Sequence, residues 1–218
     1  RKQKEIEYLS YHDKLTGLHN RAYFEEILAH LDTEGQLPLS LIIGDLNGLK
    51  LVNDALGHHE GDKLLIRMAR YLKESCRDED IIARWGGDEF VIVLPKTSEE
   101  VAMSICDSIR NGCDKCHSNE LIQLSIALGH ATKERPEEDI EKVLLKAEER
   151  MYRNKFRESN SIRNAIISSL KRSLFETNYE TEEHTRRIEK LSLSMGKALN
   201  LSDNQLDELA LLASLHDI

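Results

Sequence analysis

Two short apolar runs, "DIIAR" and "FVIVLP", are separated by two glycines that lead directly into two carboxylates. Each run has the length and β-branched content of a strand, so the sequence predicts a β-hairpin over residues 80–95. The whole stretch reads "RWGGDEF", and it places Asp88 and Glu89 side by side at the tip. A hairpin needs turn residues at this point but does not need two adjacent acids. The tip is therefore a candidate functional site.

The order of the other elements defines the expected fold class. The apolar run over residues 39–46 predicts a strand buried on both faces, and residues 121–131 predict the last strand. Helical spacing of apolar residues predicts helices over residues 21–31, 52–56, 61–75, 98–111 and 136–156. Together these elements contain a β-α-β-β-α-β core. We therefore expect an α+β fold, a ferredoxin-like, antiparallel-rich sheet flanked by helices.

The pattern changes near residue 160, where we expect a domain boundary. Residues 1–12 predict a charged N-terminal linker helix, and residues 13–160 hold every predicted strand. Residues 161–218 show no strand pattern and predict an all-α segment with helices over residues 162–174, 183–199 and 203–216. Because the chain starts without Met and inside a charged stretch, we expect it to be a piece of a longer protein.

Charge and hydropathy narrow the classes of partner. A net charge of −9 over 218 residues argues against a nucleic-acid backbone as the main partner. No apolar run approaches the roughly 20 residues that span a bilayer, so we expect no membrane contact from this segment and a cytoplasmic location. An acidic protein can still bind nucleotides if metal ions lie between its carboxylates and the phosphates.

One short stretch of the sequence contains a cysteine pattern that is typical of haem or metal binding. The stretch from Cys113 through Cys116 to His117 matches the C-x-x-C-H pattern of haem attachment and half of a zinc site. A second Cys or His pair is missing from the nearby sequence, and the surrounding "NGCDKCHSNE" is polar. We interpret these cysteines as reduced thiols in a surface loop.

The acids at the hairpin tip have a third potential neighbour, Asp45, at the end of the first predicted strand. In a ferredoxin-like core the first and third strands are adjacent, so Asp45 can approach Asp88. Clustered carboxylates repel one another unless a cation neutralises them, and oxygen ligands select Mg²⁺ or Mn²⁺. Gly86 and Gly87 leave bare backbone that a bulky ligand can approach. The alternative is a solvated turn with incidental acids, but we favour a metal–nucleotide site.

Several stretches together resemble the GGDEF family, the diguanylate cyclases. "DKLTGLHNR" resembles the D-x-LTGL-x-NR segment, and "GDLNGLKLVNDALGHHEGD" resembles the D-x-D-x-FK-x-x-ND-x-x-GH-x-x-GD block. "ARWGGDEFVIVLP" resembles the signature itself, "LSIALG" the S-x-G strand, and "AEERMYRNK" the AD-x-x-MY-x-AK helix. The matches cover residues 13–160 in the family's order.

The resemblance implies a cyclase that joins two GTP molecules into cyclic di-GMP and releases two pyrophosphates. It implies a Mg²⁺ or Mn²⁺ cofactor and a homodimer, in which each 3′-hydroxyl attacks the α-phosphorus of the other GTP. The implied metal ligands are Asp45, the Leu46 carbonyl and Asp88, with Glu89 assisting metal binding or deprotonation of the 3′-hydroxyl. The implied substrate-binding residues are Lys50, Asn53, Asp62, Gly86, Gly87 and Lys155.

Two of these residues carry further expectations. Asn53 and Asp62 fall on the guanine-reading pair, and an Asp can accept hydrogen bonds from guanine that adenine cannot provide, which favours GTP. Asp62 is also placed to cap the helix predicted over residues 61–75.

Upstream of the hairpin, Arg77 and Asp80 form an R-x-x-D pattern, which is ordinary in a charged loop. Its position resembles the family's inhibitory site for cyclic di-GMP.

The sequence also departs from the family pattern. Asn47 stands where a second Asp is common, Leu49 where Phe is usual, and Glu158 and Ser159 replace a Gly and an Arg. These changes leave an alternative open: a catalytically weak or inactive GTP-binding sensor that regulates an attached cyclic di-GMP phosphodiesterase.

The segment after residue 160 resembles the start of an HD-type phosphohydrolase domain of the HD-GYP kind. The positions that match metal ligands of that family are Glu176, His184, His216 and Asp217. Neutral imidazole nitrogens and carboxylate oxygens suit Fe, Mn or Zn. Each His alone would be an ordinary surface or packing residue. The chain stops at Ile218, before the later ligands, so we expect an incomplete site.

Overall fold

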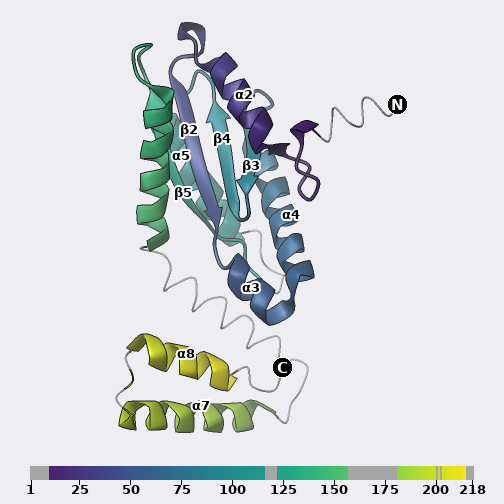
Figure 1. Ribbon diagram of the computed structural model, residues 1–218, viewed down its shortest axis with the longest axis vertical. Helices are drawn as coiled ribbons and strands as arrows, with labels where there is room; N and C mark the ends of the chain where they lie inside the picture. Colours follow the sequence, from purple (N-terminus) through teal and green to yellow (C-terminus); the bar gives the residue numbers. More distant parts are fainter. Residues whose placement is uncertain (1–9, 116–121, 157–180, 200, 202, 215–218) are drawn as a thin grey trace, which may run out of the picture. The chain divides into compact units, whose positions relative to one another are not determined.

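The computed structural model describes residues 10–115, 122–156, 181–199, 201 and 203–214. The chain divides into two compact units, Arg1–Ile162 and Arg163–Ile218, which we describe separately. Figure 1 shows the first unit as a sheet flanked by helices and the second as a pair of helices. Within the described residues, we find no helix with both the length and the apolar character needed to cross a membrane.

The first unit is built on a five-stranded sheet with the order β1-β3-β4-β2-β5. The strands are β1 (His19–Asn20), β2 (Leu39–Leu46), β3 (Ile81–Gly86), β4 (Glu89–Leu94) and β5 (Ile126–Lys133). β2 pairs antiparallel with both β4 and β5, and β3 pairs antiparallel with β4. The predicted α+β, ferredoxin-like sheet is confirmed, including the adjacency of the first and third predicted strands. The short strand β1, parallel to β3, was not predicted.

Helices cover both faces of this sheet (Figure 1). They are α2 (Arg21–Leu31), α3 (Leu49–Leu56), α4 (His58–Ser75), α5 (Glu99–Lys115) and a helix over residues 140–156. Helices α4 and α5 share one core with strand residues such as Ile42 and Ile92. Helix α2 and the helix over 140–156 share the other, with Leu41 and Val91. Alternate residues of β2 therefore enter opposite cores, as its nearly continuous apolar run predicted.

Two predicted helix starts that rested on a capping or first-turn residue were wrong. Helix α4 begins at His58 after Gly57, whose φ of 85° allows the chain to turn between α3 and α4 without a side-chain cap. Asp62 therefore lies inside the helix and does not cap it. The helix predicted from Pro136 begins at residue 140, because the Asp139 carboxylate accepts the N–H of Glu141 at 3.0 Å and caps it.

The prediction of surface-loop thiols was wrong for Cys113. Helix α5 continues past the predicted end at residue 111 to Lys115, and Cys113 is only 2% exposed within the core. A small thiol packs as an apolar group in such a position. The other two residues of the pattern, Cys116 and His117, lie outside the described residues.

The second unit contains α7 (Thr181–Ala198) and α8 (Asp203–Ser214), so helices were correctly predicted in both places. Gly196 of α7 is buried, and a Cβ at this position would lie 2.7 Å from Leu206 and 2.9 Å from Leu209. The absence of a side chain at Gly196 thus allows the two helices to approach closely. The predicted helix over residues 162–174 lies outside the described residues.

Candidate functional site

The predicted hairpin is formed by β3 and β4, and its two glycines are at the turn. The pairing is regular up to Arg84, shifts at the next residue, and resumes with Gly86 opposite Glu89. Gly87 has a φ of 53°, a left-handed conformation that side chains rarely adopt. The glycines therefore permit the tight turn that leaves Asp88 between the strands.

Asp45 meets this hairpin across the sheet. It pairs directly with Glu89, and the N–H of Leu46 donates to the carbonyl of Asp88 at 2.9 Å. Directly paired residues on adjacent strands project to the same face, so Asp45 and Glu89 lie on one face. The prediction that the three acids converge at one end of the sheet is thus supported by the pairing.

The Asp45 carboxylate is nearly buried, with 5% of its side chain exposed. Its Oδ2 accepts a hydrogen bond from Nζ of Lys155 at 2.7 Å, whereas its buried Oδ1 has no hydrogen-bond partner among the described residues. Burial raises the pKa of Asp45, and the charge of Asp88 raises it further, against the opposing effect of Lys155. Burial alone lowers the pKa of Lys155, but the hydrogen bond to Asp45 and the negative charges of Asp45 and Asp88 together outweigh it, and the net shift is upward.

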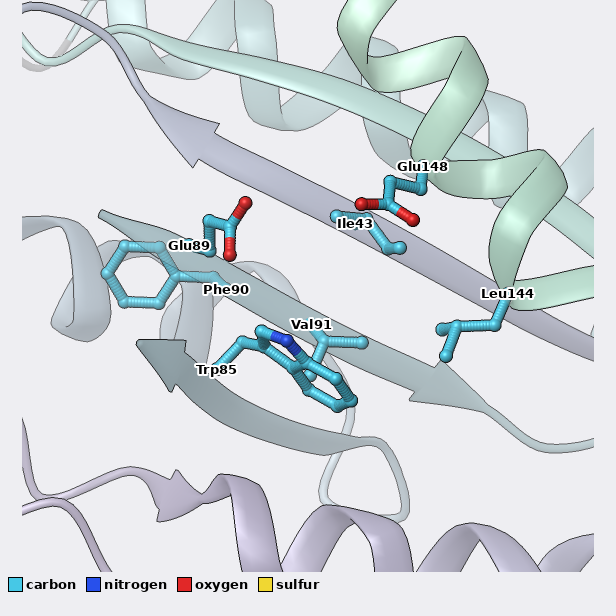
Figure 2. Close-up of a pocket in the computed structure, with 7 residues that line it drawn as sticks. All are labelled: Ile43, Trp85, Glu89, Phe90, Val91, Leu144 and Glu148. Atoms are coloured by element: carbon cyan, nitrogen blue, oxygen red, sulfur yellow. The ribbon is translucent and has the colours of Figure 1, made fainter. Parts of the chain in front are cut away.

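The pKa of Glu89 is raised as well. Burial raises the pKa of its carboxyl group, and the negative charges of Asp45, Asp88 and Glu148 raise it further. Glu148 comes from the helix over residues 140–156 and faces the same pocket as Glu89 (Figure 2). The sequence does not single out Glu148, because its helical neighbours give no sign that it faces the sheet end.

The donor set fits a hard divalent cation. Among the described residues, no group of three or more His, Cys, Asp or Glu side chains is already arranged around a possible metal position. However, the free Oδ1 of Asp45 is an oxygen donor that lacks a partner, and the nearby acids carry oxygen donors only. Mg²⁺ characteristically takes one or two carboxylates from the protein and completes its shell with phosphate and water. These residues therefore suit a metal that is shared with a phosphate ligand.

Three of the residues predicted to bind nucleotide come from the two helices that follow β2. Lys50 and Asn53 lie on α3, and Asp62 lies on α4, where it is exposed. A Cβ at Gly61 would overlap the Asn53 side chain, so α3 and α4 are in close contact beside Asp62. The structure thus places Asn53 and Asp62 on adjacent turns of packed helices.

The Arg77 and Asp80 pair forms a compact turn after α4. The Arg77 N–H donates to Oδ2 of Asp80 at 2.8 Å, and Asp80 is only 8% exposed. The Arg77 guanidinium is exposed, 3.9 Å from Oε1 of Glu79. Asp80 therefore shapes the turn, and Arg77 presents its side chain to solvent.

Arg84, just before the glycines, was also missed as a site residue. Its Nε and Nη2 donate to the carbonyl of Gly87 at 3.0 Å and 2.7 Å, and its Nη1 lies 3.1 Å from Oδ1 of Asp13. The same Asp13 oxygen accepts hydrogen bonds from Thr16, which closes a turn. Arg84 thus ties the hairpin to the turn over residues 13–18, a contact between segments that no local pattern indicates.

The implied ligands of the HD-type segment remain predictions. Glu176, His216 and Asp217 lie outside the described residues. His184 is in α7, of which only the backbone is described at that point.

The fold is that of GGDEF domains, as comparison with known proteins shows. A family profile described as "Diguanylate cyclase, GGDEF domain" matches residues 10–161, which is more than half of the chain. The chain therefore belongs to the GGDEF family.

Curated relatives and solved structures agree with this assignment. The chain is 32% identical over 176 residues to diguanylate cyclase DgcM of Escherichia coli, covering 78% of this chain and 41% of that protein. It is 32% identical over 163 residues to response regulator PleD of Caulobacter vibrioides, covering 71% and 35%. A crystal structure of the GGDEF domain of DgcB from Caulobacter crescentus, in complex with c-di-GMP, matches with a TM-score of 0.62 and 27% identity, over 69% of this chain and 90% of that one. The chain thus spans less than half the length of these curated relatives.

Proposed function

We propose that this chain acts as a diguanylate cyclase domain, which condenses two GTP molecules into cyclic di-GMP and releases two pyrophosphates. The observation that carries the proposal is the meeting of Asp45, Asp88 and Glu89 at one sheet end, with a buried Asp45 oxygen that lacks a partner. The names of the curated relatives support it. The proposal places the domain in the cytoplasm, where GTP is available.

In the proposed reaction, the 3′-oxygen of one GTP forms a bond to the α-phosphorus of the other, and the α–β phosphoanhydride bond breaks to release pyrophosphate. Glu89 takes the proton of the 3′-hydroxyl, a role that its raised pKa favours. Asp45, Asp88 and the Leu46 carbonyl would hold Mg²⁺ or Mn²⁺, which offsets negative charge on the phosphates when bound. Lys155, already beside Asp45, adds a positive charge.

Substrate selection is assigned to the two helices after β2. Asn53 and Asp62 read the guanine edge, and Lys50 contacts a phosphate. Gly86 and Gly87 offer backbone without side chains at the turn, so a nucleotide can approach the hairpin. Because one copy holds one GTP, two copies must face each other, and specific activity is expected to fall on dilution.

The test is incubation of the purified chain with GTP and Mg²⁺, followed by chromatography for cyclic di-GMP. We expect product from the unmodified chain and a loss of at least about a hundredfold in Asp45→Asn and Glu89→Gln. The matched control is Glu141→Gln, an exposed carboxylate of the helix over residues 140–156, which should retain activity. GTP binding without product would instead support the alternative of a sensor domain.

We also propose that Arg77 and Asp80 bind the product and inhibit turnover. The exposed Arg77 guanidinium suits bidentate contact with phosphate, and the buried Asp80 holds its turn. Arg77→Ala should abolish inhibition by added cyclic di-GMP, whereas Arg135→Ala, an exposed arginine elsewhere, should not. Unchanged inhibition in Arg77→Ala would contradict the proposed inhibitory site.

The HD-type assignment of the segment after residue 160 is likewise a proposal. It rests on the resemblance at Glu176, His184, His216 and Asp217. Metal analysis of a longer parent protein, compared with its His184→Ala variant, tests it directly. Equal metal content in the two proteins would contradict the assignment.

A further inference from the structure

A pocket lies beside the hairpin of β3 and β4, and most of its lining residues are not part of the proposed GTP site. Its volume is about 150 Å³, and it is lined by Ile43, Trp85, Glu89, Phe90, Val91, Leu144 and Glu148 (Figure 2). Of these, Glu89 is the member that the proposed GTP site also uses. Lys50, Asn53 and Asp62 come from α3 and α4, which pack on the opposite face of the sheet, whereas Lys155 comes from the helix that also covers the pocket. The pocket therefore adjoins the proposed GTP site at Glu89, but its other six lining residues have no part in that site.

The floor of the pocket is apolar and held in place. It is formed by the side chains of Ile43, Val91 and Leu144 and by the Trp85 indole (Figure 2). The Arg21 guanidinium lies 4.4 Å from the centroid of the indole, and the Phe24 ring meets it edge-on at 5.3 Å between centroids. These contacts fix the indole, so the pocket does not have to form when a ligand binds.

Two acidic side chains reach the pocket from opposite sides. Glu89 projects from β4, Glu148 projects from the helix above it, and both carboxylates are directed toward the space between them (Figure 2). Within the described part of the chain, neither carboxylate forms an ion pair. By contrast, the adjacent Glu149 lies 3.7 Å from Arg153 on the exposed side of the same helix. The two pocket acids thus have no cation at ion-pair distance, although the charge of Lys155 acts on Glu89 from farther away.

We propose that this pocket binds a small organic cation, with its positive group between Glu89 and Glu148 and its apolar part against Trp85 and Leu144. Apolar walls exclude water and strengthen the attraction between opposite charges. Planar amidinium and guanidinium groups match carboxylates through paired hydrogen bonds. A bare metal ion is a poorer match, because the rest of the lining is apolar and supplies no further side-chain oxygen.

The first test uses benzamidinium as the probe and the fluorescence of Trp85 as the readout, since the chain has one Trp. We expect a saturable change on titration with benzamidinium. Neutral benzamide, which has nearly the same shape, should bind at least about tenfold more weakly because it lacks the charge. GTP and metal are left out, so the outcome does not depend on whether the chain is a cyclase. Equal binding of the two probes, or no saturable change, would overturn the proposal.

The second test compares two adjacent substitutions on one helix. Glu148→Gln should weaken benzamidinium binding about tenfold, because one charged partner is lost. The matched control Glu149→Gln should bind as the unmodified chain does, and thermal unfolding of both variants checks that they are folded. Unchanged binding in Glu148→Gln would contradict the assignment. A Glu148-dependent fluorescence change with Mg²⁺ alone would also contradict it, because the pocket would then be a metal site.

Discussion

The ammonium group of Lys155 lies 2.7 Å from Oδ2 of Asp45, a residue 110 positions earlier in the chain. This contact joins the helix over residues 140–156 to the end of β2. It brings a positive charge to a sheet end where Asp45, Asp88 and Glu89 otherwise repel one another. Lys155 is therefore part of the electrostatic balance of the site before any ligand binds.

Removal of this charge should impair the proposed reaction. In Lys155→Met the acids lose their nearest cation, and negative charge on the phosphates is no longer offset from this side. We expect cyclic di-GMP formation to fall by about one to two orders of magnitude. The control is Lys146→Met, which changes an exposed lysine of the same helix and should retain activity. Full activity in Lys155→Met would show that the lysine is only structural.

The raised pKa of Glu89 predicts that stability depends on pH. Its folded-state pKa lies above the ordinary value, so the charged carboxylate destabilises the fold at pH values above that pKa. Glu89→Gln should therefore raise the free energy of unfolding by about 0.5–1 kcal/mol at pH 7, allowing for partial exposure.

The stability gained by Glu89→Gln should shrink as the pH falls through the folded-state pKa of Glu89. It should vanish below the ordinary pKa of a Glu, because the unmodified carboxyl is then also neutral. The free energy of unfolding is measured by urea unfolding without metal, followed by Trp85 fluorescence over a series of pH values. Glu137→Gln, an exposed acid, is the control. A gain that is constant with pH would contradict the electrostatic explanation.

The contact between Arg84 and Asp13 should contribute measurable coupling. Their side chains are only 15% and 24% exposed. Burial raises the pKa of Asp13, but hydrogen bonds from Thr16 and Arg84 outweigh it and the net shift is downward. A double-mutant cycle with Arg84→Gln and Asp13→Asn should give about 1 kcal/mol at pH 7.

Because the folded-state pKa of Asp13 is depressed, its contribution is present above its ordinary pKa and is lost as the pH falls through the folded value. The coupling should therefore disappear in acid. The matched control is the pair Arg21 and Glu25, which are 58% and 53% exposed and should couple by only about 0.3 kcal/mol. Equal coupling in the two cycles would refute the special role of Arg84.

Gly129 in β5 should not tolerate a side chain. An added Cβ would overlap the Ala147 carbonyl oxygen and the Met151 nitrogen, which are backbone atoms of the helix packed above it. Because backbone cannot move aside as a flexible side chain can, Gly129→Ala should cost about 3 kcal/mol of unfolding free energy. Gly35→Ala has open space and should change stability by less than about 0.5 kcal/mol. Urea unfolding of both variants measures these changes in the free energy of unfolding.

Much of the sheet was predictable from local pattern. The double-sided burial of β2 appears in its sequence as a continuous apolar run, and the hairpin of β3 and β4 as two apolar runs around Gly86 and Gly87. The convergence of Asp45 with Asp88 followed from one topological rule, that the first and third strands of such a core are adjacent.

The rest depended on contacts between distant segments. No spacing rule relates Lys155 to Asp45, and the two-residue β1 is too short to leave a periodic signal. The polar letters around Cys113 suggested a loop, yet tertiary packing extends α5 through it. Asp62 was a chemically reasonable helix cap, but the positive φ of Gly57 starts the helix earlier.

The span between Asp45 and Lys155 also has a consequence for synthesis of the protein. At ribosomal speeds of about 5–20 residues per second, residue 155 is made roughly 5 to 20 seconds after residue 45. Throughout that interval the nascent chain carries Asp45 without its cation. A product cut short before residue 155 retains the entire GGDEF signature but lacks the contact that balances its acids. The proposed cyclase activity should therefore be weaker in such a shortened product than in one that includes the whole helix over residues 140–156.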